Sequence, residues 1–319
     1  MVAAAAVLWG ILVTFVRKLN AGGLGAMEIV SVRVYGSAFF LFVGIGGMER
    51  IILKWKPLNR ISEKGVPGKS SLLRIRWKDS WCFAGTGVVS IVFFSYCYFR
   101  NVEVSSVALS SILMYTSPVW VTLISAIVFK ERITGKKLAA LLIALAGCVL
   151  VSGIVGCQAD ASGQMSGNAN APGQVSLQGI LLGLGSGIGY GLYSIFGRFA
   201  LNKGYHPMTV SAYTFLFACV GVLPFVNVSS ILNKLMAEPL LILWAVCISL
   251  FTTCVSFTLY TCGLQYMEPG RAAVLATLEP IVSTLVGVCY YKEPLTAVMA
   301  VGIVLVLVSS ILISGLDCS

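Results

Sequence analysis

Two ionisable side chains lie inside long apolar stretches of the sequence, where a charge is costly. Glu279 precedes Pro280 in one stretch, and Arg33 lies in another. A carboxylate in hydrocarbon costs roughly 2.5–3.5 kcal/mol on insertion scales, so an interaction must offset that cost. Glu279 could face a cavity, binding a cationic group or exchanging a proton, or it could bond to helix backbone and fix a break at Pro280. Arg33 could contact a solute, or it could form a structural pair with Glu28 or with a helix end. We favour the structural pair.

Aromatic residues supply candidate walls for such a cavity, because many lie within apolar stretches rather than at the membrane interface, where they usually gather. A tyrosine offers both a π face and a hydroxyl group in a dry site. We expect some of them to line a cavity and the others to pack helices: Trp9, Tyr98, Tyr115, Trp120, Tyr190, Tyr193, Tyr213 and Tyr260. Our candidates for a substrate cavity are Trp9, Tyr98, Tyr115, Tyr190, Tyr260 and Glu279.

Two prolines are candidate helix breaks. Pro118 and Pro280 lie in apolar stretches at matching places in the two parts of the chain. Each removes one backbone hydrogen bond and locally opens its helix. The freed carbonyl groups could contact a solute, or each proline could be a packing kink.

The elements that must position these residues are membrane helices. Hydrophobic residues make up 58% of the 319 positions and charged residues 11%, whereas soluble domains have about 45–50% apolar and about 25% charged residues. A span takes about 20 residues, so the chain predicts an all-α membrane protein with ten transmembrane helices. The expected spans are 2–20, 27–48, 80–100, 105–129, 135–155, 178–202, 208–228, 238–263, 271–291 and 294–316.

Composition also argues against several classes of function. The net charge is +10, but nine of the 22 Lys and Arg residues fall between Arg50 and Lys78, which is typical of a membrane-flanking loop that faces anionic lipid. We therefore expect no nucleic acid partner. The ten cysteines form no CxxC pair and there is one histidine, so we expect no metal site and no cofactor. The spans hold no catalytic cluster, and we predict that the protein is not an enzyme.

Loop composition divides the chain into two halves. Residues 1–155 form a first five-helix unit, residues 156–177 a flexible linker rich in small and polar residues, and residues 178–319 a second five-helix unit. The face that holds both termini collects 16 Lys and Arg residues, against five on the other face. The positive-inside rule then places both termini in the cytoplasm and the linker outside.

The two halves repeat each other. A shift of 162 positions superposes Tyr98 on Tyr260, Pro118 on Pro280, Lys130 on Lys292, Glu131 on Glu293, Thr134 on Thr296 and Gly153 on Gly315. A shift of 181 superposes Gly10 on Gly191, Phe15 on Phe196, Arg17 on Arg198, Gly23 on Gly204 and Met27 on Met208. Because each half has an odd number of helices, the second must enter the membrane from the opposite side. Inverted repeats of this kind place a solute site near the midplane and expose it to each side in turn.

The repeated motifs also resemble a known family. They are Trp9-Gly10, Arg33, Ser117-Pro118, Lys130-Glu131, Gly147 and Gly153 in the first half, and Tyr190-Gly191, Leu278-Glu279-Pro280, Lys292-Glu293 and Gly302 in the second. In this order they resemble the EamA-like ten-helix branch of the drug/metabolite transporter superfamily. The resemblance implies secondary transport, often export of amino acids or other metabolites, with a pocket between helices one, three, four, six, eight and nine.

We therefore expect a secondary transporter in the plasma (inner) membrane that exports a small metabolite, an amino acid or similar amphipathic solute, by alternating access. Its expected partners are the solute, membrane lipid and protons, with Glu279 and Arg33 as the coupling or charge residues. A carrier of sugar phosphates or nucleotide sugars is the alternative within transport, although it needs cations in the cavity and Arg33 and Arg100 are the candidates. A membrane receptor or scaffold that moves no solute is the alternative from another class.

Overall fold

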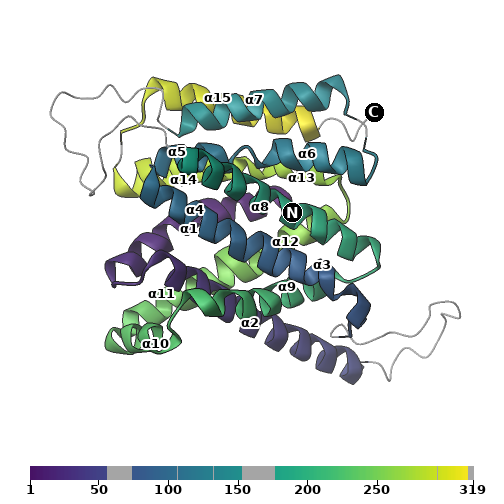
Figure 1. Cartoon of the computed structure of the whole chain (residues 1–319), viewed down its shortest axis with the longest axis vertical. Coiled ribbons are helices and arrows are strands. Elements are labelled where there is room, and N and C mark those ends of the chain that lie inside the picture. Colours follow the sequence, from purple (N-terminus) through teal and green to yellow (C-terminus); the bar gives the residue numbers. More distant parts are fainter. Residues whose placement is uncertain (56–73, 106, 132, 153–176, 293, 315–319) are drawn as a thin grey trace, which may run out of the picture.

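The chain is described by a computed structural model that covers residues 1–55, 74–105, 107–131, 133–152, 177–292 and 294–314. Over these residues it consists of helices joined by short turns, with no strand (Figure 1). The predicted all-α membrane fold is confirmed. The expected linker lies almost entirely outside the described residues, as does most of the first basic loop.

Apolar stretches of the first half form the helices that the sequence predicts, with several interruptions. They are α1 (Val2–Ala21), α2 (Ala26–Trp55), η2 (Trp77–Asp79), α3 (Ser80–Ala84), η3 (Gly85–Val92), α4 (Phe93–Val104), α5 (Val107–Met114), α6 (Ser117–Val128) and α7 (Gly135–Val151).

The second half contains a similar series with two additions. It comprises α8 (Leu177–Asn202), α9 (Pro207–Val222), η4 (Leu223–Phe225), α10 (Val228–Ala237), α11 (Pro239–Ser249), η5 (Leu250–Val255), α12 (Ser256–Leu264), α13 (Pro269–Ala276), α14 (Leu278–Tyr291) and α15 (Ala297–Ser314). The short helices η4 and α10 lie in the connection between α9 and α11.

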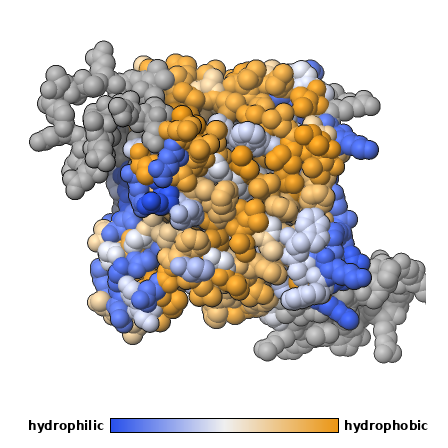
Figure 2. All heavy atoms as spheres, in the orientation of Figure 1, coloured by the Kyte–Doolittle hydropathy of each residue, from blue (hydrophilic) through white to orange (hydrophobic). Residues whose placement is uncertain are grey.

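Nine helical segments of the described chain are long and apolar enough to cross a membrane. Helix α7 is shorter, with 17 residues, and it pairs with α15 along the top of Figure 1. Apolar residues cover the middle of the face in Figure 2, and hydrophilic residues gather toward its two sides. Exposed Phe39, Leu181 and Val304 illustrate the outward-facing apolar side chains that a bilayer would cover.

Backbone conformations match between the two halves. In the described chain the residues with positive φ are Gly23 at 80° and Gly204 at 85°, and Lys130 at 57° and Lys292 at 59°. These pairs are the ones that the sequence shifts superpose. A non-glycine residue with positive φ is uncommon, so two lysines sharing it at equivalent positions support a common ancestry of the halves. The π-helical segments η3 and η5 also fall at corresponding places.

Both predicted helix breaks lie just before the prolines. A turn at Tyr115–Thr116 separates α5 from α6, and Thr277 separates α13 from α14. Pro118 and Pro280 then fall in the first turn of the helices that follow. A proline is tolerated there because its missing N–H would have no partner within the helix.

Helices α7 and α15 approach each other through two glycines. A Cβ atom added to Gly147 would lie 2.9 Å from the carbonyl oxygen of Gly302, and one added to Gly302 would lie 2.8 Å from that of Gly147. Small residues allow membrane helices to come this close, so that van der Waals contact holds them together. The pair lies beside the other helices, and the cavity described next contains no residue of either helix.

Candidate functional site

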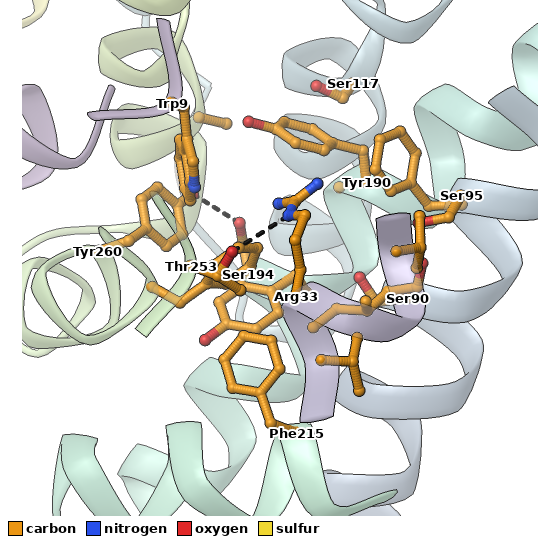
Figure 3. A pocket seen from close by; sticks show the side chains of 18 of the residues that line it. Trp9, Arg33, Ser90, Ser95, Ser117, Tyr190, Ser194, Phe215, Thr253 and Tyr260 are labelled. Atoms are coloured by element: carbon orange, nitrogen blue, oxygen red, sulfur yellow. Dashed lines mark hydrogen bonds between the residues drawn. The ribbon is translucent and has the colours of Figure 1, made fainter. Parts of the chain in front are cut away.

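A buried cavity lies between helices of both halves (Figure 3). Its volume of about 50 Å³ suffices for a few water molecules, since one needs roughly 10–15 Å³. Both expected halves contribute to its lining, which comprises Trp9, Val30, Arg33, Val34, Ser90, Ile91, Phe94, Ser95, Ser117, Val121, Tyr190, Gly191, Tyr193, Ser194, Phe215, Thr253, Phe257, Tyr260 and Ala273. The six spans named from the family resemblance all contribute, together with α2 and α9.

Aromatic rings form one wall of this cavity. The centroid of the Trp9 ring lies 5.1 Å from that of Phe257, 5.3 Å from Tyr260 and 6.3 Å from Tyr190. The Phe94 ring packs on the other side of Tyr190, at 5.3 Å. Edge contacts of this kind hold the rings in fixed orientations, so the wall is a rigid surface for the apolar part of a ligand.

Arg33 is the charged residue that lines the cavity, among the described residues. Its Nε donates to Thr253 Oγ1 at 3.1 Å, and Figure 3 shows the guanidinium inside the cavity between Thr253 and Tyr190. The pairing with Glu28 expected from the sequence is wrong, because Glu28 binds Lys234 Nζ at 2.6 Å. In the described chain no carboxylate lies within 4 Å of Arg33. A buried cation without an ion pair can bind an anionic group.

Glu279 lies behind the aromatic wall. The Tyr190 hydroxyl donates to Glu279 Oε2 at 3.1 Å, and the carboxylate is not among the atoms that line the cavity. Glu279 and Arg33 form no direct ion pair. The cavity is therefore lined by one cationic side chain, Arg33, and Tyr190 links the lining to the carboxyl group of Glu279 outside it.

The structure brings some of the candidate aromatics together and leaves others apart. Trp9, Tyr190 and Tyr260 line the cavity, whereas Tyr98 and Tyr115 do not. The Tyr98 hydroxyl lies 3.3 Å from Ser111 Oγ, and the Tyr115 ring packs in a cluster with Cys148, Ile281 and Val306. Of the three other aromatic candidates from the sequence, Tyr193 lines the cavity, Trp120 donates to Thr116, and Tyr213 packs against Phe42 and Phe83.

Sequence reasoning missed the hydroxyl groups on the two π-helical segments. Ser90 in η3 donates to the Gly189 carbonyl at 2.7 Å, and Thr253 in η5 donates to the Ile248 carbonyl, five residues earlier, at 3.1 Å. Both line the cavity, and π-helical turns often occur at functional sites. The sequence did offer one sign of them, because Ser90 and Thr253, both with hydroxyl groups, lie at nearly equivalent positions of the two repeats.

Among the described residues, no three His, Cys, Asp or Glu side chains are placed to hold a metal ion. The eight described cysteines are free, and four of them are buried. The described lining of the cavity offers one cation, several hydroxyl groups and an aromatic wall.

A model of the EamA-like transporter family matches residues 1–153 and 177–315. The chain belongs to the EamA-like transporter family. Its similar relatives include an uncharacterized transporter of Archaeoglobus fulgidus, 28% identical over 73% of this chain and 77% of that protein. The uncharacterized transporter YwfM of Bacillus subtilis is 24% identical over 74% of each.

A solved crystal structure shares the fold, with a TM-score of 0.71, 19% identity, and coverage of 99% of this chain and 96% of that one. As an EamA-like protein, the chain is a multi-pass membrane protein of a transporter family, and its partner is a small-molecule solute. The family and the relatives favour a transporter over an enzyme.

Proposed function

We propose that this EamA-like protein is a secondary transporter that exports a small metabolite, an amino acid or similar amphipathic solute, by alternating access. One observation carries the proposal: a buried cavity between the two halves holds Arg33, a cation with no ion pair in the described chain. The guanidinium binds the carboxylate of the solute, and the wall of Trp9, Phe257 and Tyr260 packs against its apolar part.

The small volume of the cavity supports a cycle of opening and closing. The cavity has room for a few water molecules, so it must open wider toward one side before an amino acid enters. Two inverted five-helix halves open such a site to one side at a time by rocking about it. Both termini then lie in the cytoplasm, and the linker lies outside the plasma (inner) membrane. The matched left-handed residues of the halves support this architecture.

Glu279 is the proposed coupling residue. Its carboxylate lies partly buried in a membrane span and accepts a hydrogen bond from Tyr190, a residue of the cavity wall. Protonation would change that contact, and with it the position of Tyr190 beside the solute. In this way, uptake of a proton on one side and its release on the other drive export.

The coupling is tested with Glu279→Gln in proteoliposomes that hold a mixture of radiolabelled amino acids. We expect flux of the unsubstituted protein to depend on pH and that of Glu279→Gln to be nearly independent of it. Glu103→Gln, which changes an exposed carboxylate at the end of α4, serves as the matched control. Persistence of the pH dependence in Glu279→Gln would exclude this coupling role.

A carrier of sugar phosphates is the second candidate, and Arg33 favours it because a guanidinium also binds phosphate. Arg100, the other cation considered, pairs with Glu103 at the exposed end of α4 instead. Competition decides between the two: sugar phosphates that block amino acid flux and are themselves carried would replace our proposal. Absence of flux for both classes would leave a receptor or scaffold.

A further inference from the structure

A second, polar pocket lies at the C-terminal ends of α6 and α8, beside the N-terminal ends of α7 and α13. Its volume is about 520 Å³, and its lining is largely charged: Phe129, Lys130, Glu131, Thr134, Lys137, Arg198, Asn202, Glu268 and Arg271. It shares no residue with the central cavity.

Lys137 forms ion pairs with two carboxylates of this pocket. Its side chain is 2% exposed, and its Nζ donates to Glu131 Oε2 and to Glu268 Oε2, each at 3.0 Å. Burial of an ammonium group is costly unless it is paired in this way. Burial also raises the pKa of Glu131 above its ordinary value, whereas Glu268 is partly exposed.

The two carboxylates belong to different parts of the fold. Glu131 lies in the turn between α6 and α7, in the same half as Lys137. Glu268 is the N-terminal cap of α13, in the second half. The contact of Lys137 with Glu131 therefore stays within one half, while its contact with Glu268 joins the two.

An apolar layer separates the polar pocket from the central cavity. Val121 of α6, Ile195 of α8 and Ala273 of α13 form a buried cluster, against which Phe129 and Phe199 pack. Val121 and Ala273 also line the central cavity, and Phe129 lines the polar pocket. The layer is tightly packed, because a Cβ atom added to Gly191 of α8 would lie 2.8 Å from Val121.

We infer that the meeting point of α6, α8 and α13 is the route between the central cavity and the polar pocket, and that the Lys137–Glu268 contact is the latch that keeps it shut. This inference rests on the proposed transport function. Separation of α13 from α6 and α7 would break the latch and part the layer of Val121, Ile195 and Ala273 together. Solute then passes directly between the two pockets.

The latch is tested by comparing Glu268→Gln with Glu131→Gln. Both remove one carboxylate 3.0 Å from the same ammonium group, but only the first removes an ion pair that joins the halves. Glu268→Gln also removes the ion pair of Glu268 with Arg271 Nε at 3.4 Å, which lies within the second half. The reporter is a cysteine at Ile195, which is buried and lines neither pocket. Its reaction with a water-soluble maleimide is measured on purified protein, with the chain that lacks the added cysteine as background.

We expect Glu268→Gln to speed labelling of the added cysteine roughly tenfold, because a charge-assisted hydrogen bond that favours the closed form is lost. Glu131→Gln should leave the rate near that of the parent. Equal acceleration in both variants, or none in Glu268→Gln, would overturn the latch. Thermal unfolding of each variant is measured in parallel, to separate opening of the gate from general loss of structure. If labelling is faster in both variants in proportion to a fall in Tm, that result also counts against the latch.

Flux measurements keep this inference separate from the proposed function. Faster labelling of Glu268→Gln in a protein that carries no amino acid or sugar phosphate would support the latch and refute transport of those solutes. If the protein carries amino acids and Glu268→Gln leaves the labelling rate unchanged, transport is supported and the latch is refuted.

Discussion

Arg33 Nε donates to Thr253 Oγ1 across 3.1 Å, joining residues 220 positions apart in the chain. Arg33 belongs to α2 in the first half and Thr253 to the π-helical segment η5 in the second. A long arginine side chain has many rotamers, and ordering it is costly. The threonine hydroxyl therefore fixes the guanidinium inside the cavity before any ligand arrives.

Thr253→Val should weaken binding of the carboxylate-bearing solute, because it removes the hydroxyl while keeping the shape of the side chain. We expect about a tenfold loss of affinity, which corresponds to the roughly 1.4 kcal/mol of one hydrogen bond to a charged group. The measurement is the thermal stabilisation of purified protein by a panel of amino acids. Thr253→Ser retains the hydroxyl and should bind as the parent does; equal weakening by both changes would assign Thr253 a packing role.

Gly302→Ala should destabilise the contact between α15 and α7. The added Cβ would lie 2.7 Å from the Val151 backbone nitrogen and 2.8 Å from the Gly147 carbonyl oxygen. Because these neighbours are backbone atoms, the helices must move apart, and the expected loss is about 1–3 kcal/mol of the free energy of unfolding. Denaturant unfolding in detergent measures it.

Gly46→Ala is the matched control for that change, since a Cβ atom at Gly46 meets nothing within 4 Å. Alanine also favours a helix more than glycine does, so this variant should be as stable as the parent or slightly more so. A loss of stability in Gly46→Ala equal to that in Gly302→Ala would contradict the steric explanation.

The pH dependence of stability should report the contact between Lys203 and Asp79. Lys203 follows α8, and its hydrogen bond to the Asp79 carboxylate raises its pKa above the ordinary value of 10.5. The folded state then binds the lysine proton more tightly than the unfolded chain does. The stabilisation is therefore complete below about pH 10.5 and is lost as pH rises through the raised pKa.

Thermal unfolding of Lys203→Met tests this dependence. Its Tm should lie below that of the parent at pH 7, and the difference should shrink above pH 10.5. Lys18→Met, which changes an exposed lysine at the end of α1, should follow the parent throughout. A Tm difference for Lys203→Met that persists undiminished in alkali would assign the effect to packing rather than to charge.

Much of the fold could be predicted because the bilayer imposes length and apolarity on each span. Single shifts of the sequence also found the pairs Gly23 with Gly204 and Lys130 with Lys292, which share positive φ. The breaks were placed to within a few residues, because a proline is best tolerated in the first turn of a helix. The extra residue per turn in η3 and η5 has no comparable sequence signal, so the role of Thr253 stayed hidden.

The site itself could be predicted less well, because an apolar span gives little indication of which face points inward. Trp9 and Tyr190 line the cavity, while Tyr98 and Tyr115, chosen by the same reasoning, lie elsewhere. Their directions depend on how neighbouring helices pack. Lys137 escaped notice for a similar reason. A lysine at the start of a helix is usually solvated, whereas this one is buried beside Glu131 and beside Glu268, which is 131 positions away in the chain.

The break at Thr277 has an electrostatic consequence for Glu279. It makes the carboxylate part of the first turn of α14, well inside the span Pro269–Tyr291. The aligned peptide dipoles of a helix place about half a positive charge at its N-terminus, which stabilises a nearby anion by roughly 0.3–1 kcal/mol, and by up to about 2 kcal/mol when partly buried. An unbroken helix would deny the carboxylate this field. By starting a new helix within the hydrocarbon, the chain keeps an acid there without a directly bonded cation.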